Sequence, residues 1–373
     1  MRHYYLGLAA NYSGGHLLRH TFAIGRERDR TILQQYLAQK YNGDALLTKN
    51  GRSALTLALK AYFKPGDGIV VNGFTCYAVY EAIKAAKMVP IWADINKDNL
   101  NFDTKTLSKA ISNNNQNRGV PIRGLIIQNS LGNVVNISEI ENFTKKHNLT
   151  IIEDLAHCVG AKYADGREVG TIGAAAALSF GKEKSIDTIS GGAVVLHHPY
   201  YSKIEVPGKL PKISDTLRAR FYPVFGAVAR GLSHIYLGGI WMRILVKIHW
   251  VEKSADNKLD LTRKIAKFEA KMALDQLKNL REHNKVPLRT YRLVEDRPQV
   301  LSTLRSKGFY FDGLWYEKPV SPERYYKKVR FPESDCPVAV EVASKIINLP
   351  TYYNKKDLVP AEEVIKKYRE EQK

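Results

Sequence analysis

Short apolar runs alternate with amphipathic stretches over residues 45–200, and this alternation constrains the fold more than any other feature of the chain. Helical periods separate the apolar runs, and alternation of this kind is typical of βαβ units. It predicts an α/β fold with a largely parallel sheet that helices cover on both faces. The apolar runs cover residues 68–71, 88–92, 124–128, 150–153, 175–180 and 192–196, and the helical periods cover residues 53–63, 80–87 and 137–147.

The pattern changes after this region. Residues 201–252 are basic and aromatic, and a helical run follows at residues 263–283. From about residue 290, short strands alternate with helices, which is typical of an α+β domain. We therefore expect a large α/β domain over residues 1–285, with residues 201–252 as an insertion, and a smaller C-terminal α+β domain over residues 286–373.

The chain of 373 residues is strongly basic, because 57 lysine and arginine residues against 37 acidic residues give a formal net charge of +20. A hydrophobic content of 44% excludes a disordered polyelectrolyte, so the charge indicates an anionic partner of a folded protein. Nucleic acid is not expected as that partner. The aromatic residues of the most basic segment lie among aliphatic residues, and no nucleic-acid-binding motif is recognised.

The cysteines Cys76, Cys158 and Cys336 lie far apart and form no cluster with histidine, so neither a disulfide framework nor a metal site is expected. The chain start has no pattern of a secretory signal, and no run reaches the roughly 18 apolar residues of a membrane-spanning helix. These features predict a cytoplasmic protein.

Two features at strand ends have the chemistry of a ligand site, which an open parallel sheet places at the carboxyl ends of its strands. The turn Asn50-Gly51-Arg52-Ser53 opens directly into a predicted helix, so its free N–H groups and the Ser53 hydroxyl can hold a phosphate. Ser53 is equally typical of an ordinary N-cap. Asp154 follows a buried run and either pairs with a cation or protonated ring nitrogen, or caps the next turn.

Two further features follow the run at residues 175–180. Lys182 and Lys184 are candidate nucleophiles, although a lysine in this position is also typical of a solvated loop. The turn Ser190-Gly191-Gly192 leads into the next strand and agrees equally with plain turn chemistry.

Together these groups match the requirements of pyridoxal phosphate. Lysine forms a Schiff base with its aldehyde, aspartate keeps its pyridine nitrogen protonated, and a helix N-terminus holds its phosphate. The aspartate precedes the lysines by about thirty residues, and the glycine turn follows them. The combination therefore favours a pyridoxal phosphate site over four unrelated structural features.

Residues 47–349 resemble the DegT/DnrJ/StrS family of pyridoxal-phosphate-dependent aminotransferases of fold type I, most of which aminate nucleotide-linked keto-sugars. The similarity lies in several blocks that occur in the family's order. NGRSALTLAL is similar to SGTxALxLAL, TIIEDLAHCVGAKYADGREVGTIG to VIEDAAQAxGAxYxGRxVGSxG, ALSFGKEKSIDTISGGAVV to FSFxxxKxLxxGEGGAVV, and CPVAVEVASKIINLP to PxAExxAxxxLSLP.

The resemblance implies a role for particular residues. Lys184 matches the lysine that binds the cofactor, and Asp154 matches the partner of the pyridine nitrogen. Related sugar dehydratases have histidine at the lysine position, so Lys184 indicates transamination. The further cofactor-binding positions are Gly51, Arg52, Ser53, His157 and Ser179.

The chain also departs from the family pattern. Arg52 replaces a threonine, and His157 replaces a glutamine near the cofactor's ring hydroxyl. Cys76 stands where the family has an aromatic residue that stacks on the pyridine ring. The Asn-x-Arg motif, which contacts the cofactor phosphate of the partner subunit, is not intact, and Thr262 and Lys264 lie nearest to it.

The resemblance implies a homodimeric enzyme that moves an amino group from glutamate or glutamine to a keto-sugar. We expect a nucleotide-linked or lipid-linked acceptor in the biosynthesis of surface polysaccharide or a related product. The alternative is a non-catalytic or regulatory membrane-associated protein that retains the aminotransferase fold.

The basic segment has two interpretations. Residues 201–251 contain eight lysine and arginine residues against two acidic ones, among many aliphatic and aromatic side chains. This composition suits a helix in the interface of an anionic membrane, which would place the protein at the inner face of the membrane. It agrees equally with a buried helical hairpin that shapes a dimer interface or the mouth of an active site.

Overall fold

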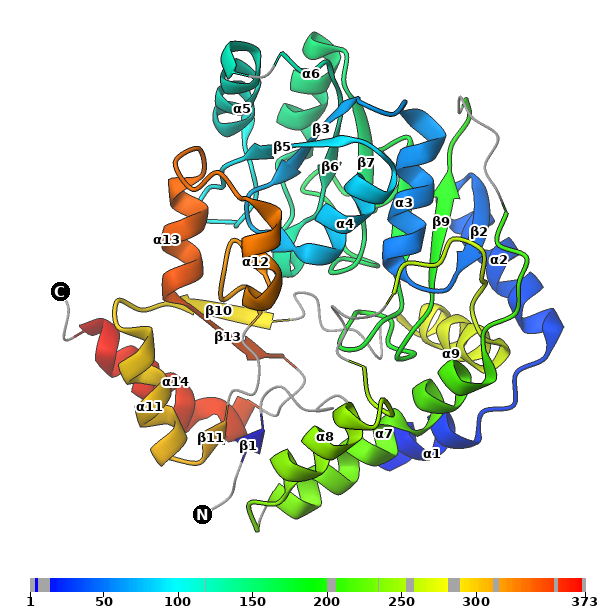
Figure 1. Ribbon diagram of the computed structural model, residues 1–373, viewed down its shortest axis with the longest axis vertical. Coiled ribbons are helices and arrows are strands. Elements are labelled where there is room, and N and C mark those ends of the chain that lie inside the picture. Colours follow the sequence, from blue (N-terminus) through cyan, green and yellow to red (C-terminus); the bar gives the residue numbers. More distant parts are fainter. Residues whose placement is uncertain are drawn as a thin grey trace.

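A computed structural model describes most of the chain (Figure 1). The described residues are 4–5, 14–117, 119–199, 206–233, 235–252, 258–280, 289–310, 315–351 and 355–370.

A sheet of seven strands forms the centre of the molecule, in the order β2-β9-β8-β7-β6-β3-β5. Strand β9 is antiparallel to both of its neighbours, and the other adjacent pairs are parallel. The predicted α/β fold with a mostly parallel sheet is therefore confirmed. Its strands are β2 (Asp44–Thr48), β3 (Gly68–Asn72), β5 (Val89–Ala93), β6 (Ile122–Ile127), β7 (Thr150–Asp154), β8 (Ala175–Ser179) and β9 (Gly192–Leu196).

Helices cover both faces of this sheet, because alternate strand residues enter two separate cores. Val70 and Leu125 pack with helices α2, α5, α6 and α9, whereas Val71 and Ile126 pack with α3, α4 and α13 on the opposite face. The helices are α2 (Glu27–Tyr41), α3 (Gly51–Tyr62), α4 (Tyr77–Ala85), α5 (Thr104–Asn117), α6 (Ile137–His147), α9 (Lys267–Lys278) and α13 (Pro337–Lys345).

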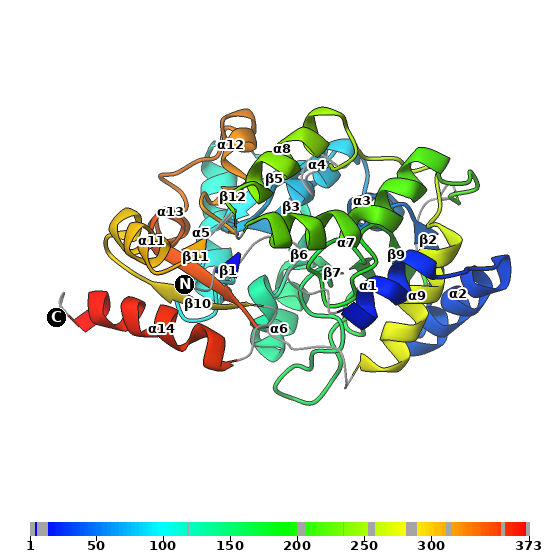
Figure 2. The same ribbon diagram turned by 90° about the horizontal axis from the view of Figure 1, so that it is seen from below.

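The basic segment forms a pair of helices, α7 (Ile213–Ser233) and α8 (Gly238–Lys247), which pack against each other. The indole Nε1–H of Trp241 on α8 donates to the carbonyl oxygen of Phe225 on α7, at 3.3 Å. Helix α1 (Gly14–Phe22) lies against α7 (Figures 1 and 2). Within the described ranges, no helix has the length and apolar character that crossing a membrane requires.

The C-terminal part begins at strand β10 (Arg289–Leu293), which pairs antiparallel with β13 (Ile346–Pro350). The boundary that we expected at residue 285 lies outside the described residues, and the division into two domains remains a prediction. The other elements here are α11 (Arg297–Ser306), β11 (Phe309–Tyr310), β12 (Val320–Ser321), α12 (Glu323–Val329) and α14 (Lys355–Glu370).

Two of these elements pair with short strands from earlier in the chain: β11 with β1 (Tyr4–Tyr5) and β12 with β4 (Thr75–Cys76).

A buried carboxylate makes a further connection between the C-terminal part and the large sheet. Asp94, which follows β5, accepts hydrogen bonds from the backbone N–H groups of Val338 and Ala339 at 3.0 and 2.9 Å. Both groups belong to the first turn of α13, so this carboxylate satisfies orphan donors and faces the positive end of the helix.

Replacing Asp94 with alanine should lower the free energy of unfolding by about 2 kcal/mol, because the two amide groups lose their buried acceptor. Urea unfolding followed by circular dichroism measures this change. The matched control is Asp98→Ala at an exposed position, which should stay within about 0.5 kcal/mol of the parent. Equal stabilities of the two variants would contradict the anchoring role.

Candidate active site

A cavity of about 190 Å³ lies at the carboxyl ends of β7 and β8, beside the N-terminus of α3. The structure brings all but one of the predicted site residues to its wall, and Ser53 is the exception. Helix α7 contributes several side chains that sequence reasoning did not assign to the site. The lining residues used below are Lys49, Gly51, Arg52, Cys76, Asp154, His157, Ser179, Lys182, Lys184, Asp215, Arg218, Tyr222, Glu252 and Tyr316.

The N-terminus of α3 approaches the end of β8 closely because the contact residue is glycine. A Cβ atom on Gly51 would lie 2.5 Å from the Cβ of Ser179, and one on Gly192 would lie 2.6 Å from the carbonyl carbon of Asn50. Asn50 is the N-cap, and its Oδ1 accepts the backbone N–H of Ser53 at 2.9 Å. The first N–H groups of α3 and the Ser179 side chain therefore lie together at the cavity, where they can hold an anion.

Ser53 itself points elsewhere. Its side chain is fully buried, and its hydroxyl donates to the carbonyl oxygen of Asp260 at 3.0 Å. Arg52 lines the cavity and forms an ion pair with Glu81 on α4. Arg52 therefore presents a cation to a ligand in the cavity. Ser53 does not line the cavity, and its hydroxyl connects the first turn of α3 to the backbone at Asp260.

Lys184 and His157 form a hydrogen-bonded pair, with 2.9 Å between Nζ and Nε2. The Nδ1 atom of His157 accepts the backbone N–H of Leu131 at 3.2 Å, so a neutral ring carries its proton on Nε2. Burial lowers the pKa of His157 and the pKa of Lys184, and each lowering favours the uncharged form. In that state the Nε2–H of His157 donates to the free amine of Lys184, which is the nucleophilic form of lysine.

The C-terminal part of the chain encloses this pair. The ring of Trp315 stacks on His157 with 5.2 Å between centroids, and the Nζ atom of Lys184 lies 4.8 Å from the Trp315 centroid. Arg289 also lies over Trp315 and forms a buried ion pair with Glu183 at 2.5 Å. The sequence pattern around Trp315 indicates only an aromatic strand. The contact of Trp315 with Lys184 therefore could not be predicted from the sequence.

Asp154 and Glu153 end strand β7 and point to opposite sides of it. Asp154 lines the cavity, and its Oδ1 accepts the backbone N–H of Ala156 at 3.0 Å, so it caps the next turn and faces the site at once. Burial raises the pKa of Asp154 to about 6, which leaves most of the carboxyl groups ionised at neutral pH. The Asp154 carboxylate can therefore accept a hydrogen bond from a protonated ring nitrogen.

Glu153 is fully buried on the other side of β7. Its carboxylate accepts four hydrogen bonds: the Tyr163 hydroxyl at 2.8 Å, and the backbone N–H groups of Gly170, Ile172 and Gly173 at 2.7, 2.8 and 2.7 Å. These bonds fix the loop that connects β7 to β8, and with it the backbone of Asp154.

The aromatic residues around Cys76 have a distinct arrangement. Cys76 is the N-cap of α4 and lines the cavity, whereas the ring of the next residue, Tyr77, stacks on Tyr325 at 4.3 Å between centroids. Tyr316 is a buried aromatic side chain at the cavity wall, stacked on Phe74 at 4.6 Å. The aromatic surface at this end of the cavity thus comes from the C-terminal part of the chain.

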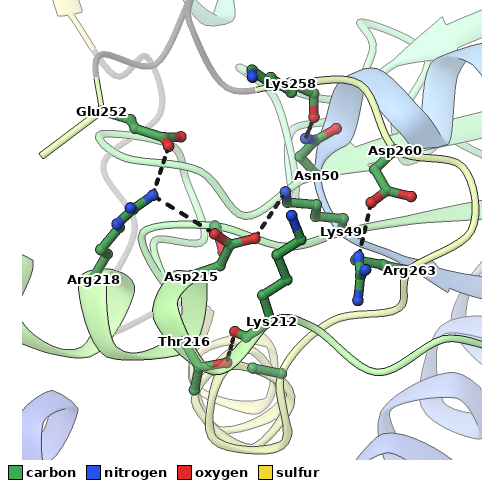
Figure 3. A network of polar contacts seen from close by, with 12 residues as sticks. Lys49, Asn50, Lys212, Asp215, Thr216, Arg218, Glu252, Lys258, Asp260 and Arg263 are labelled. Carbon is green, nitrogen blue, oxygen red and sulfur yellow. Dashed lines mark hydrogen bonds and ion pairs between the residues drawn. The ribbon is translucent and has the colours of Figure 1, made fainter. Parts of the chain in front are cut away.

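Helix α7 closes another side of the cavity through a chain of ion pairs, which Figure 3 shows from close by. Arg218 lies 2.9 Å from the carboxylate of Glu252 and 3.8 Å from that of Asp215, and Asp215 pairs with Lys49 at 3.0 Å. Lys49 immediately precedes the N-cap of α3. One face of the basic segment, on α7, therefore lines the cavity.

The residues nearest to the family's cross-subunit motif do not line the cavity in this chain. The Thr262 hydroxyl donates to the Asp260 carboxylate at 2.8 Å, and Lys264 pairs with Glu27 at 3.4 Å. Among the residues that the structure describes, no group of three or more His, Cys, Asp or Glu side chains has the arrangement of a metal site.

Comparison with known proteins gives a consistent picture. The model of the DegT/DnrJ/EryC1/StrS aminotransferase family matches residues 30–220. A pleiotropic regulatory protein of Geobacillus stearothermophilus is 23% identical over 81% of this chain and 78% of its own length. GDP-perosamine synthase of Escherichia coli O157:H7 is 26% identical over 85% and 83%. A DegT DnrJ EryC1 StrS aminotransferase from Brucella abortus shares the fold, with a TM-score of 0.66 at 18% identity over 96% and 94%.

The substitution Glu153→Gln should lower the free energy of unfolding by about 3 kcal/mol, because an amide NH₂ group would then face backbone donors in a buried site. Amide hydrogen exchange at Gly170, Ile172 and Gly173 should accelerate with it. Exchange mass spectrometry and urea unfolding measure the two effects. Glu139→Gln, at an exposed position of α6, is the matched control and should change neither; unchanged exchange in the Glu153 variant would remove this carboxylate from its anchoring role.

Proposed function

We propose that this chain, which belongs to the DegT/DnrJ/EryC1/StrS aminotransferase family and uses pyridoxal phosphate as its cofactor, transfers an amino group from an amino-acid donor to a keto-sugar. One observation carries this proposal: Lys184, Asp154, His157 and Ser179 converge on a single cavity at the carboxyl edge of the sheet. A relative named GDP-perosamine synthase supports a sugar acceptor, and one named lipopolysaccharide biosynthesis protein RfbH supports a place in polysaccharide biosynthesis. We expect the sugar to be nucleotide-linked or lipid-linked. Glutamate or glutamine is the expected donor.

The residues around the cavity fit the cofactor. Gly51 leaves space in which a Cβ atom would collide with Ser179, so the N–H groups of α3, Arg52 and Ser179 would hold the phosphate. Asp154 would keep the ring nitrogen protonated, and Lys184 would bind the aldehyde. When bound, the cofactor supplies an electron sink that makes the Cα proton of an amino acid acidic.

The protein side chains then have separate tasks. Lys184 would move the proton at Cα as general base and return it as general acid, since its lowered pKa favours the free amine. The Nε2 atom of His157, 2.9 Å away, would orient that amine. Trp315 and Tyr316 would exclude water from the same side, because both rings pack against His157.

A second candidate function is a regulatory protein that retains the fold without catalysis. It is favoured by the relative named as a pleiotropic regulatory protein and by the cysteine at position 76. The absorbance spectrum of the purified protein, before and after addition of L-glutamate or L-glutamine, separates the two functions. Bound cofactor whose spectrum changes with a donor supports the enzyme, whereas a spectrum without cofactor supports the regulator.

Replacing Lys184 with alanine should abolish transamination and the visible absorbance of the lysine-bound cofactor, because Lys184 is the residue that would hold the aldehyde. The free energy of unfolding should stay within about 1 kcal/mol of the parent or rise, since a partly buried amine is removed. Spectroscopy and urea unfolding measure both quantities. Lys271→Ala on the exposed side of α9 is the control; a Lys184 variant that keeps activity and absorbance would exclude Lys184 from the reaction.

Replacing Asp154 with alanine should retain some cofactor but lower turnover roughly 100-fold, because an unprotonated pyridine is a poor electron sink. In the parent enzyme, cofactor affinity should fall as the pH drops through about 6, where the carboxyl of Asp154 gains a proton and loses its charge. Cofactor titration by fluorescence between pH 5 and pH 8 tests this. An identical pH profile in Asp154→Ala would assign the titration to another group.

We further propose that the enzyme is cytoplasmic and docks on the anionic inner face of the membrane through α8. Ile240, Ile244 and Ile248 recur every fourth residue and are 45, 49 and 54% exposed, so they form an apolar stripe along one side of the helix. Arg243 and Lys247 lie on the same helix and suit anionic headgroups. The outer side of the basic segment thus supports the membrane interpretation.

Sedimentation with vesicles that contain phosphatidylglycerol tests this docking. The parent should sediment at low salt, and the variant Ile240→Ser/Ile244→Ser/Ile248→Ser should lose most of this binding, because less apolar area is buried in the interface. Neutral phosphatidylcholine vesicles are the control. A parent that stays in the supernatant at low salt would refute the proposal.

The homodimer that the family resemblance implies also remains a prediction. Size-exclusion chromatography with light scattering measures it, and a monomer at micromolar concentration would contradict it.

A further inference from the structure

Lys182 is the second lysine of the strand-end loop, and the proposed function gives it no task. It lines the same cavity as Lys184, two residues further along the chain. Between them, Glu183 has a left-handed backbone conformation with a φ of 60° and pairs with Arg289 outside the cavity. The turn therefore directs both lysines to the cavity wall while the acidic residue between them leaves it.

The Nζ atom of Lys182 contacts an aromatic ring and a backbone carbonyl oxygen, while Asp187, Glu252 and Glu183 lie close enough to raise its pKa. Its Nζ atom lies 3.9 Å from the centroid of the Tyr222 ring and donates to the backbone carbonyl of Glu252 at 2.5 Å. Within the described part of the chain, no carboxylate forms an ion pair with it. Burial lowers the pKa of Lys182 to about 8, so the ammonium form still predominates at neutral pH. A partly buried ammonium group that has no direct ion pair with a carboxylate can take an anion as its ligand.

Arg218 brings a second cation to the same place. It lies on α7 one turn before Tyr222, and its guanidinium contacts the Glu252 carboxylate at 2.9 Å (Figure 3). Lys182 and Arg218 thus bind two oxygen atoms of one residue, Glu252, which places both cations at one end of the cavity. Arg218 is partly exposed, and a guanidinium has five donors, so its present pairs leave room for a further oxyanion.

We propose that Lys182 and Arg218 form an anion-binding subsite that takes an acidic group of a substrate, either the carboxylate of the amino donor or a phosphate of the sugar acceptor. The subsite rests on the proposed function for the identity of its ligand, because both substrates of that reaction carry oxyanions. The cofactor phosphate is a separate ligand, for which the N-terminus of α3 and Ser179 provide the donors. The subsite belongs to the chain that carries Lys184, since α7 of that chain forms the wall.

Anion binding to the cofactor-loaded protein tests this proposal without turnover. Isothermal titration with inorganic phosphate and with succinate should show saturable binding of at least one of the two, and the preferred anion distinguishes an acceptor phosphate from a donor carboxylate. The substitution Lys182→Met keeps the apolar stem and should weaken that binding roughly tenfold, whereas Lys182→Arg should stay within about threefold. Arg218→Met should weaken it as well, and Lys271→Met is the matched surface control.

Three results would overturn the subsite. The parent protein would bind neither anion, or Lys182→Met would bind the anion as tightly as the parent. In the third, Lys182→Met would lose affinity for pyridoxal phosphate and retain affinity for the probe anions, which would assign Lys182 to the cofactor. The visible absorbance of the bound cofactor is recorded in every sample, so a failure of the proposed function appears there and is distinguishable from a loss of anion binding.

Discussion

The buried carboxylate of Glu153 is the interaction on which the geometry of the site depends. An ion in the protein interior costs several kcal/mol unless it is fully hydrogen-bonded, and Glu153 offsets that cost by accepting four hydrogen bonds. Three of the donors are backbone groups of the loop that leads to β8. The carboxylate therefore connects β7 to this loop, in addition to the backbone hydrogen bonds between β7 and β8. Because side chains alternate along a strand, fixing Glu153 on one side of β7 also fixes Asp154 on the cavity side.

Burial of the groups in the cavity then shifts their pKa values. Desolvation is the largest cause of the raised pKa of Asp154 and of the lowered pKa of Lys184, so the same burial moves an acid and a base toward their neutral forms. Trp315 and Tyr316, which lie far from both residues in the sequence, contribute to that burial: the Nζ atom of Lys184 lies 4.8 Å from the Trp315 centroid, and Tyr316 lies close enough to Asp154 for the carboxylate to raise the pKa of the tyrosine. In the proposed function, the C-terminal part of the chain would therefore take part in the chemistry by excluding water, even though neither the lysine nor the aspartate belongs to it.

Apolar runs predicted the central strands because these strands are buried on both faces, so hydrophobicity alone marks them. The cavity residues at the ends of β7 and β8 followed from the same topology. Strand β2 was not predicted, because its apolar run covers only three residues, 45–47, and follows an exposed Asp44. Ser53 shows a different limit: one interpretation of its hydroxyl assumed a bound phosphate and the other a helix N-cap, whereas its acceptor is the carbonyl oxygen of Asp260, 207 residues away. Contacts of that separation, like those of Trp315, depend on tertiary packing.

The two interpretations of the basic segment excluded each other only while it was treated as a single surface. In the structure its helices have different environments: α7 turns Arg218 and Tyr222 toward the cavity, and α8 turns an isoleucine stripe outward. The basic residues of the segment divide in the same way, because Arg218 lies at the cavity, whereas Arg243 and Lys247 lie on α8. Charges on α8 are screened by dissolved salt within about 10 Å at 0.1 M, whereas a pair inside a cavity is screened much less. Salt therefore separates the two proposed roles physically, because attraction to a charged membrane surface weakens at ionic strengths that leave an anion site inside the cavity largely intact.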